Sequence, residues 1–348
     1  MENKNIIEVN NLSKTFNLEA GFFAKNKQNV YAVNDVSFNI ERGTTYGLVG
    51  ESGCGKTTTA RLIIQMYKQT AGKIQFFDGE GQTSADAASS NTQNQTSGAD
   101  QNRGAKIRLP SDVGTYSQKQ LRLYREKVKY IFQDPARSLN PRLTVYNVLT
   151  AGLKYSSLWQ GKQNARQLAE KIITEVGLSP EDLERRPAEF SGGQRQRISI
   201  ARGLIMNPSL LICDEVVSAL DVSIQGQIIN LLQDLRQSRN LSYIFITHDL
   251  KVASYFCDKI GVMYRGFLVE EAPAADLYKT ALHPYTKLLF QGAQGELNNS
   301  NQEVKTTLTQ ENCCPFAYRC PHATDRCKNE LPEFKEVSQG HRVRCFLD

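Results

Sequence analysis

One eight-residue stretch constrains the fold of this chain more than any other. Residues 50–57 read GESGCGKT and fit the pattern G-x-x-x-x-G-K-[ST]. The preceding residues 44–49 predict a short strand, and Lys56–Met66 predict a helix. In such a strand–loop–helix unit, glycines let successive backbone N–H groups turn inward around phosphate oxygens, and the helix N-terminus adds partial positive charge. The stretch therefore predicts a nucleotide phosphate site in an α/β fold.

Two side chains of this phosphate loop (residues 50–57) have distinct expected roles. Lys56 should reach the β- and γ-phosphates of a nucleotide, and the hydroxyl of Thr57 should contact Mg²⁺. The expected nucleotide-binding residues of this region are Gly50, Ser52, Gly53, Cys54, Gly55, Lys56, Thr57 and Thr58.

Length and composition bound the class of protein. The 348 residues suffice for one large domain with an appendage, or for two domains. The net charge of +6 is modest and the basic residues are scattered, so we expect no nucleic-acid partner. No apolar run approaches the roughly 20 residues that span a bilayer, and the first residues lack the apolar core of a signal peptide. These features predict a cytosolic protein that can dock on a membrane protein.

Short apolar runs that predict buried strands alternate with stretches of helical periodicity along most of the chain. Early strands are expected at Ile6–Leu12 and Tyr31–Ile40, with a loop-like excursion at 16–29 between them. Helical periodicity dominates residues 144–183. This order indicates an α/β core with a largely parallel sheet, interrupted by a helical insert at about 134–190. A single phosphate loop argues against a tandem ATPase.

A polar segment from about residue 80 to 116 interrupts this order. It consists largely of Gly, Ser, Thr, Asn, Gln and Asp, with hardly an aromatic residue. Such a composition cannot bury enough apolar surface to offset the entropy of ordering the chain. The sequence therefore predicts a disordered surface insertion here, clearest over Glu80–Lys106.

Five further motifs follow the phosphate loop in a fixed order. They are Gln133 with Asp134-Pro135, FSGGQ at 190–194, Asp214-Glu215 behind four apolar residues, SALD at 218–221, and His248 behind an apolar strand. Together they resemble the ATP-binding-cassette (ABC) family, with its Walker A, Q-loop, signature, Walker B, D-loop and H-loop. The resemblance covers nearly the whole chain from Ile6. It implies a RecA-like core, an antiparallel β subdomain, a helical subdomain and the hydrolysis of ATP.

The resemblance also implies roles for individual residues. Asp214 should hold Mg²⁺, and Glu215 should act as general base on the attacking water. Gln133 should bind the metal or that water, and His248 should contact the γ-phosphate. The expected catalytic residues are thus Glu215, His248, Gln133 and Lys56, and the expected Mg²⁺ ligands are Thr57, Gln133 and Asp214.

Other expected ATP contacts lie outside the phosphate loop. The resemblance implies that the signature motif and D-loop reach the ATP of a facing subunit through Ser191, Gly192, Gly193, Gln194 and Asp221. Catalysis would then need two ATPase subunits with two nucleotides between them. An aromatic ring should stack on the adenine; Phe16 matches the family position best, and Tyr31 is the alternative.

The residues within and around these motifs resemble those of the oligopeptide/dipeptide importers. The matching stretches are IFQDP at 131–135, SLNPR at 138–142, EFSGGQRQR at 189–197, SALDVSIQ at 218–225 and HPYT at 283–286. The resemblance implies a peripheral protein on the cytoplasmic face of the membrane. It would form a heterodimer with a second ATPase under two permeases, fed by an extracytoplasmic binding protein, with the helical insert contacting a permease. Val216 departs from the family's usual proline after the Walker B glutamate.

Two alternative functions stay open. Related importers carry nickel complexes or other small solutes, and the sequence does not fix the cargo. A soluble cassette ATPase acting on nucleic acid or the ribosome is the alternative from another class. Such proteins usually carry paired cassettes or long coiled-coil inserts, and the sequence shows neither.

Five of the eight cysteines crowd the last part of the chain, in a predicted C-terminal extension (281–348) that follows a nucleotide-binding domain (6–280). In a reducing cytosol, clustered cysteines favour metal over disulfides. The pattern Cys314-x5-Cys320-x6-Cys327-x17-Cys345 resembles a motif associated with a [4Fe–4S] cluster in peptide-importer ATPases. Four thiolates also suit Zn²⁺, and unligated thiols are a third reading. Cys313 could replace Cys314; only the family pattern favours the latter.

Overall fold

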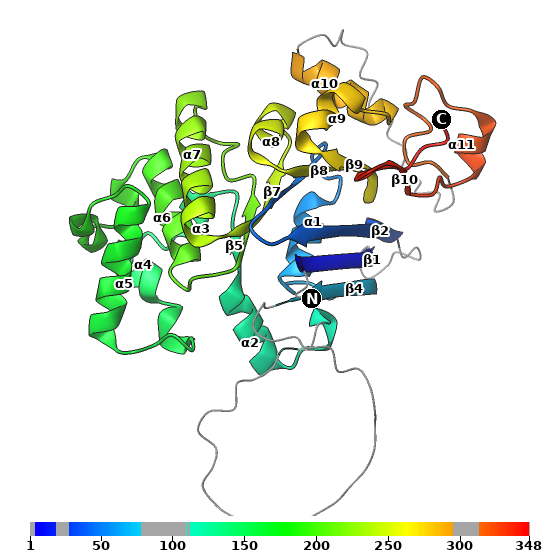
Figure 1. The fold of residues 1–348 in the computed structure, drawn as a ribbon. Helices are drawn as coiled ribbons and strands as arrows, with labels where there is room; N and C mark the ends of the chain where they lie inside the picture. The colour runs from blue at the N-terminus through cyan, green and yellow to red at the C-terminus, as the bar shows by residue number, and fades with distance from the viewer. Residues whose placement is uncertain (1–3, 19–27, 78–108, 110–111, 295–312, 348) are drawn as a thin grey trace, which may run out of the picture.

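The structure, a computed structural model, describes residues 4–18, 28–77, 109, 112–294 and 313–347 (Figure 1). The described strands form two sheets. A three-stranded antiparallel sheet has the order β2 (Gln28–Glu41), β1 (Asn5–Leu18), β4 (Ala71–Phe76). An eight-stranded sheet has the order β10 (Lys335–Ser338), β11 (His341–Val343), β9 (Phe267–Pro273), β8 (Lys259–Tyr264), β3 (Thr45–Val49), β7 (Ser242–Thr247), β6 (Leu210–Asp214), β5 (Val128–Ile131).

The centre of the larger sheet is parallel, as predicted. Strand β3 pairs in parallel with both β7 and β8, and β6 pairs in parallel with β7 and β5. Every residue of β3, β6 and β7 is buried, which explains their continuous apolar runs. The carboxyl ends of these strands meet at one edge of the sheet, so the residues that follow β3, β6 and β7 lie near one another.

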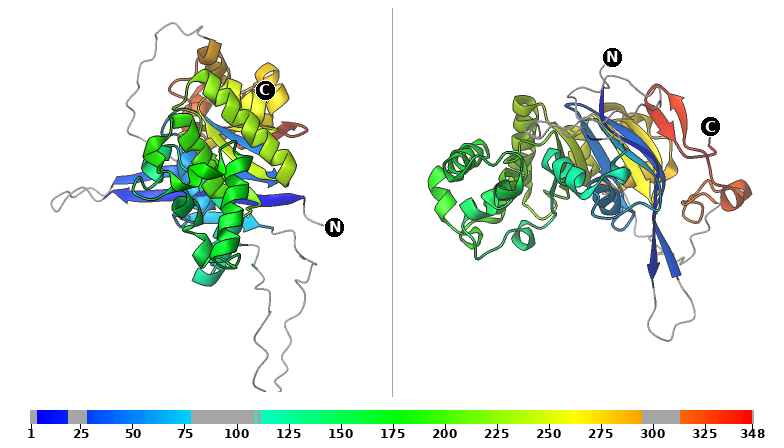
Figure 2. Two further views of the ribbon diagram at one scale, coloured as in Figure 1. Left: turned by 90° about the vertical axis from the view of Figure 1, so that its left-hand side faces the viewer. Right: turned by 90° about the horizontal axis from the view of Figure 1, so that it is seen from below.

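Helices gather on one side of the larger sheet, where they form a separate layer (Figures 1 and 2). This region contains α3 (Pro135–Ser138), α4 (Val145–Thr150), α5 (Lys162–Glu175) and α6 (Gly192–Leu204), with 3-10 turns at Leu153–Tyr155, Pro180–Glu184 and Pro187–Glu189. Its buried side chains include Leu149, Ile173 and Leu183. The predicted helical insert at about 134–190 contains α3, α4 and α5 of this layer, whereas α6 begins just beyond its predicted end.

The remaining helices flank the sheets. They are α1 (Lys56–Ile63), α2 (Gln118–Lys127), α7 (Val222–Arg239), α8 (Leu250–Phe256), α9 (Ala274–Thr280), α10 (Pro284–Gln294) and α11 (Asp325–Asn329). None of the helices in the described ranges is long and apolar enough to cross a bilayer.

Strands β1 and β2 are longer than the sequence predicts. The loop expected at 16–29 is wrong at both ends, because Phe16 pairs with Val30 and Leu18 pairs with Gln28 across an antiparallel ladder. Residues 19–27 lie outside the described part of the chain. Cross-strand pairing, rather than local composition, keeps these polar ends in the sheet.

The insertion predicted to end at about 116 ends earlier. Asp112 forms a bridge with Gln75 of β4, and Val113–Thr115 forms a 3-10 turn. Tyr116 is buried and packs its ring 5.7 Å from that of Tyr124. Residues 78–108, which contain the clearest part of the predicted insertion, lie outside the described residues.

The C-terminal extension is joined to the nucleotide-binding part by β structure. Strand β11 pairs with β9, so residues beyond 281 complete the larger sheet. The fully buried carboxylates of Glu270 and Glu271 in β9 meet side chains of β11: His341 Nε2 lies 2.8 Å from Glu270, and Arg342 Nη2 donates to Glu271 over 2.7 Å. The predicted boundary at 280/281 therefore falls within one shared sheet.

Candidate functional site

The phosphate loop lies between β3 and α1, where the sequence predicts it. Gly50 and Gly55 have φ angles of +147° and +112°, which residues other than glycine rarely adopt. A Cβ atom on Gly50 would lie 2.2 Å from the carbonyl oxygen of Met263, and one on Gly55 would lie 2.4 Å from that of Ala32. Both glycines are therefore required by backbone conformation and by the close approach of neighbouring strands.

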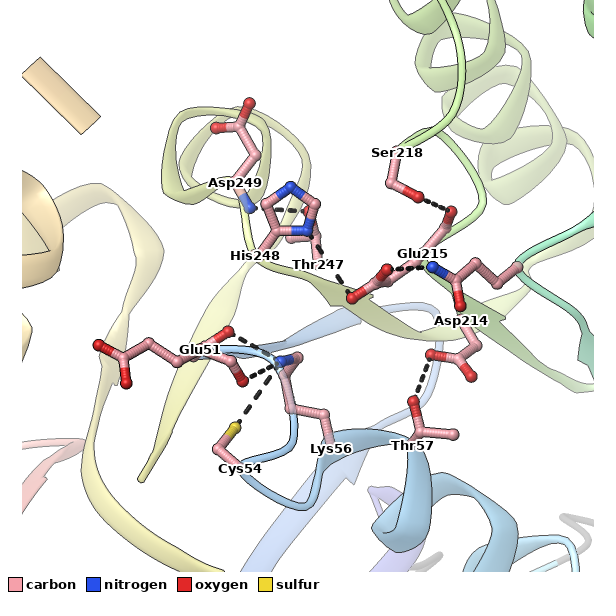
Figure 3. Close-up of polar contacts among 12 residues, drawn as sticks. Glu51, Cys54, Lys56, Thr57, Asp214, Glu215, Ser218, Thr247, His248 and Asp249 are labelled. Atoms are coloured by element: carbon pink, nitrogen blue, oxygen red, sulfur yellow. Dashed lines mark hydrogen bonds and ion pairs between the residues drawn. The ribbon is translucent and has the colours of Figure 1, made fainter. Parts of the chain in front are cut away.

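Lys56, the seventh residue of the phosphate loop, has a buried side chain that folds back on the loop (Figure 3). Its Nζ donates to the carbonyl oxygens of Gly50 (2.8 Å) and Glu51 (2.9 Å), and lies 3.7 Å from Cys54 Sγ. A cation held at the mouth of a glycine-rich loop is suited to an anionic ligand. This position agrees with the expected role of Lys56 toward phosphate.

Thr57 and Asp214 place oxygen atoms side by side opposite Lys56. The Thr57 hydroxyl donates to Asp214 Oδ1 over 3.0 Å, and the Tyr130 hydroxyl donates to the other carboxylate oxygen. Burial raises the pKa of Asp214, against the effect of these two hydrogen bonds. A hydroxyl and a carboxylate are the hard oxygen ligands that suit Mg²⁺, so this pair fits the predicted metal.

Glu215 has the backbone strain expected of a functional position. Its φ of +49° lies in the left-handed region, which is costly for a residue with a side chain. Its N–H donates to Ile246 O over 3.0 Å, and its carbonyl oxygen accepts from Ser218 Oγ over 2.9 Å. These bonds fix the turn after β6 and direct the carboxylate toward the ends of β5 and β7.

Two predicted catalytic side chains meet the Glu215 carboxylate. Gln133 Nε2 donates to Oε2 over 2.6 Å. His248 Nδ1 lies 3.7 Å from Oε1 (Figure 3). The side chain of Glu215 is 18% exposed and that of His248 is 58% exposed, so the pair opens toward solvent. Gln133 thus lies beside the expected general base, and Thr57 and Asp214, two of the residues expected to hold Mg²⁺, lie beside each other.

The signature motif lies apart from the phosphate loop. Ser191 caps α6 and forms a capping box with Gln194, over 3.4 Å and 3.0 Å. Ser191 and Gly192 are exposed, and Gly193 packs beside Ile224 of α7. Asp221 precedes α7, is exposed, and makes no cap hydrogen bond. Within the described residues, no hydrogen bond joins this group to residues 50–57.

The two candidate adenine-stacking rings lie on the β1–β2 hairpin. Phe16 is half-buried and packs edge-on against Tyr67, with ring centroids 5.4 Å apart. Tyr31 pairs with Thr15 and precedes Ala32, whose carbonyl approaches Gly55. Both rings therefore lie on the hairpin that borders the phosphate loop.

The four cysteines of the predicted metal motif are gathered in one part of the extension. The N–H of Cys314 donates to the carbonyl oxygen of Cys327 over 2.9 Å. Burial, with smaller contributions from the nearby thiols of Cys327, Cys345 and Cys320, raises the pKa of the Cys314 thiol to about 12. Among the residues described, however, no three His, Cys, Asp or Glu side chains are arranged to hold a metal ion. As they stand, the thiols do not form a metal centre, and the predicted cluster is not supported.

Several contacts of the site could not be predicted from the sequence motifs. Tyr130 contacts the carboxylate of Asp214 from the neighbouring strand, and a tyrosine inside an apolar strand reads as a core residue. Tyr285 and Arg319 both contact Glu51 of the phosphate loop from the C-terminal extension. Tyr285 belongs to the HPYT stretch, but only the folded chain shows where its hydroxyl lies.

Comparisons with known proteins agree with the geometry. The family model described as ABC transporter matches residues 33–218, and the one described as oligopeptide/dipeptide transporter, C-terminal region, matches residues 269–327. The oligopeptide transport ATP-binding protein AppF of Bacillus subtilis is 38% identical, over 98% of this chain and 97% of that protein. The oligopeptide transport ATP-binding protein OppF of the same organism is 39% identical, over 98% and 96%.

Solved structures show the same fold. A dimeric structure of the ATP-binding cassette MJ0796 in a post-hydrolysis state, bound to ADP and Pi, superposes with a TM-score of 0.59 and 24% identity, covering 77% of this chain and 98% of the other. The cassette fold, the two matching family models and the full-length relatives agree. The chain belongs to the ABC transporter family and is one of its ATP-binding ATPases, with the oligopeptide/dipeptide type of C-terminal region.

Proposed function

We propose that this chain hydrolyses ATP to power the uptake of di- or oligopeptides by a membrane importer. The observation that carries the proposal is the convergence of Gln133 and His248 on the carboxylate of Glu215, beside the oxygen pair of Thr57 and Asp214. The peptide cargo is supported by relatives described as oligopeptide transport ATP-binding proteins and by the matching C-terminal region.

In the proposed site each side chain has one task. Lys56 and the N–H groups of the loop bind the phosphates, and Thr57 with Asp214 would hold Mg²⁺, which neutralises charge on the phosphates when bound. Glu215 accepts a proton from the attacking water. Gln133 orients the Glu215 carboxylate, and His248 is close enough to orient the water and the γ-phosphate from the other side.

Two chains would complete each site. Ser191 and Gly193 lie at the exposed N-terminus of α6, a position suited to an anion, and Asp221 is exposed beside them. Because these groups lie apart from the chain's own phosphate loop, we propose that they face the ATP of a second ATPase subunit. The dimeric form of the MJ0796 cassette supports such an arrangement.

The general-base assignment is tested by Glu215→Gln in the assembled transporter. We expect ATP binding to persist while hydrolysis and peptide uptake fall roughly 10²–10⁴-fold, the usual size of a general-base contribution. Glu330→Gln removes an exposed carboxylate of the extension and serves as the control. Hydrolysis that is unchanged in the Glu215 variant would remove this residue from the mechanism.

The proposed assembly and cargo are tested by purifying the chain with its membrane partners. We expect a second ATPase, two permeases and a binding protein, on the cytoplasmic side of the membrane, and peptides identified by mass spectrometry on the binding protein. Bound nickel or another small solute would instead identify the alternative cargo. A chain that purifies with ribosomes or nucleic acid and without permeases would contradict the proposal.

We further propose that Cys314, Cys320, Cys327 and Cys345 take up a [4Fe–4S] cluster, with Zn²⁺ as the alternative. The support is the resemblance and the gathering of the four thiols, which would have to close further around the group. Anaerobic purification followed by metal analysis tests this. About four iron atoms per chain with absorption near 400 nm support the cluster. One zinc supports the alternative, and neither metal refutes both.

A further inference from the structure

Glu51, the second residue of the phosphate loop, is held from the C-terminal extension. Its backbone N–H donates to the Tyr285 hydroxyl over 2.9 Å. Its carboxylate accepts two hydrogen bonds from the guanidinium of Arg319, over 2.9 Å and 3.0 Å. In sequence, these partners lie 234 and 268 positions from Glu51. We call Glu51, Tyr285 and Arg319 the loop brace.

The brace is anchored in packed aromatic side chains. The ring of Tyr285 is fully buried, 4.5 Å from the Tyr264 ring and 5.5 Å from the Phe316 ring between centroids. The guanidinium of Arg319 lies over the same two rings, 5.6 Å and 5.7 Å from their centroids. Stacking of this kind pre-organises the planar fork of arginine for a bidentate bond with a carboxylate. The brace therefore differs from a surface ion pair between flexible side chains.

The brace holds the peptide group between Gly50 and Glu51, whose carbonyl oxygen accepts a hydrogen bond from Lys56. The N–H of Glu51 and the C=O of Gly50 belong to one planar peptide group and point in opposite directions. Tyr285 binds the N–H end, and Lys56 Nζ donates to the C=O end over 2.8 Å. Gly50 has the conformational freedom of glycine, so this peptide group can rotate unless it is held. Holding it fixes one of the two carbonyl acceptors of Lys56.

We propose that the C-terminal extension positions the phosphate loop through Tyr285 and Arg319, so that Lys56 is ordered before ATP arrives. Both are positioning residues, since they reach the nucleotide only through Glu51 and Lys56. This inference rests on the proposed role of the phosphate loop in binding ATP. Without the brace, the loop samples other conformations, and the apparent affinity falls by the fraction of competent loops.

The test measures equilibrium binding of Mg–ATP to the full-length chain. We expect Arg319→Gln to raise the Kd about three- to tenfold, the range for a partly exposed, charge-assisted bond. Glu51→Gln should have a similar effect, and the double variant should be no weaker than the weaker single variant, because both changes remove one interaction. Arg319→Lys keeps the charge without the fork and should lie between the wild type and Arg319→Gln.

Two further variants separate positioning from stability. Tyr285→Phe keeps the buried ring, removes only the acceptor of the Glu51 N–H, and should also raise the Kd. Arg326→Gln removes another arginine of the extension, one that pairs with Glu330, and should leave the Kd unchanged. Thermal unfolding is recorded for every variant.

Each outcome decides the matter. A raised Kd in the brace variants, with Arg326→Gln unchanged, supports positioning of the loop. Wild-type Kd values in the brace variants, with or without a lower unfolding temperature, overturn it and leave a purely structural contact. If Lys56→Ala binds ATP as well as the wild type does, the assignment of the phosphate loop fails first, and the inference falls with it.

Discussion

At the residue scale, the site combines strain and buried charge that the fold must support. Glu215 keeps a left-handed backbone conformation, and Asp214 beside it has a buried carboxylate. Neither feature favours the stability of the empty protein. Hydrogen bonds from Tyr130, Thr57 and Gln133 hold the two carboxylates in place, so the chain retains them at a cost that ligand binding can offset.

Replacing Asp214 with Asn should stabilise the protein when neither metal nor nucleotide is bound. Because burial raises the pKa of Asp214 in the folded state, its ionised form is penalised at about pH 7. The variant should therefore unfold at a higher temperature than the wild type near neutral pH. This advantage should disappear as the pH falls below the ordinary carboxyl pKa of about 3.9, where the wild-type group is protonated in both states. Thermal unfolding across this pH range measures the difference.

The same substitution should have the reverse effect when Mg–ATP is present. The wild type gains stability from the ligand, whereas the Asn variant lacks the anionic oxygen that suits the metal. A wild type that is the more stable of the two near neutral pH without ligand would contradict the assigned burial penalty.

At the element scale, the sequence predicted the repetitive parts better than the connections. The strand predicted at residues 44–49 corresponds to β3 (Thr45–Val49), and the helix predicted at Lys56–Met66 begins at Lys56 and ends at Ile63, because continuous apolar runs and periodicity are local signals. The ends of β1 and β2 were missed because their composition is typical of a loop, whereas pairing across the hairpin, from Leu18 to Gln28, keeps them in the sheet. The pairing of β11 with β9 has no local signature either, since it depends on charges of β9 that look like surface residues in the sequence.

The contact between His341 and Glu270 should be essential for docking β11. The Glu270 carboxylate is fully buried and also accepts from the N–H groups of Leu282 and His283. Replacing His341 with Ala leaves a buried acceptor incompletely satisfied, which should lower the free energy of unfolding by about 1–3 kcal/mol. Val337→Ala, at an exposed position of β10, should change it by less than about 0.5 kcal/mol. Equilibrium urea unfolding measures both changes. If the two variants lose the same free energy of unfolding, the contact of His341 with Glu270 is not essential for docking β11.

At the scale of the whole molecule, the predicted site residues form two groups. Lys56, Thr57, Gln133, Asp214, Glu215 and His248 meet at one edge of the sheet, whereas Ser191–Gln194 and Asp221 lie together elsewhere. The motifs single out the residues of both groups, because each has a fixed residue pattern, and their roles toward ATP stay predictions. Contacts such as Arg319 with Glu51 could not be predicted, since they depend on how the extension folds back on the core.

Replacing Ser191 with Asp tests whether the signature motif acts on the ATP of a facing subunit. The change should leave ATP binding by a single chain intact and impair hydrolysis that needs two chains. Aspartate caps a helix as well as serine does, so the fold should persist, but its charge would meet the phosphates of a facing ATP. We expect ATP binding to the isolated chain to be unchanged and hydrolysis in the assembled transporter to fall at least tenfold. Ser117→Asp is the matched control, because Ser117 caps α2 with the same Ser-x-x-Gln capping box. Equal hydrolysis by both variants would exclude the signature from the facing site.

The pairing of β11 with β9 also has a consequence during synthesis. Glu270 leaves the ribosome 71 positions before His341, so the growing chain carries β9 as an open sheet edge until β11 has been synthesised. An uncovered edge strand invites pairing with other chains. Nascent chains stalled before residue 341 should therefore aggregate or bind chaperones more readily than chains that include β11, so this three-residue strand protects the whole molecule from mispairing.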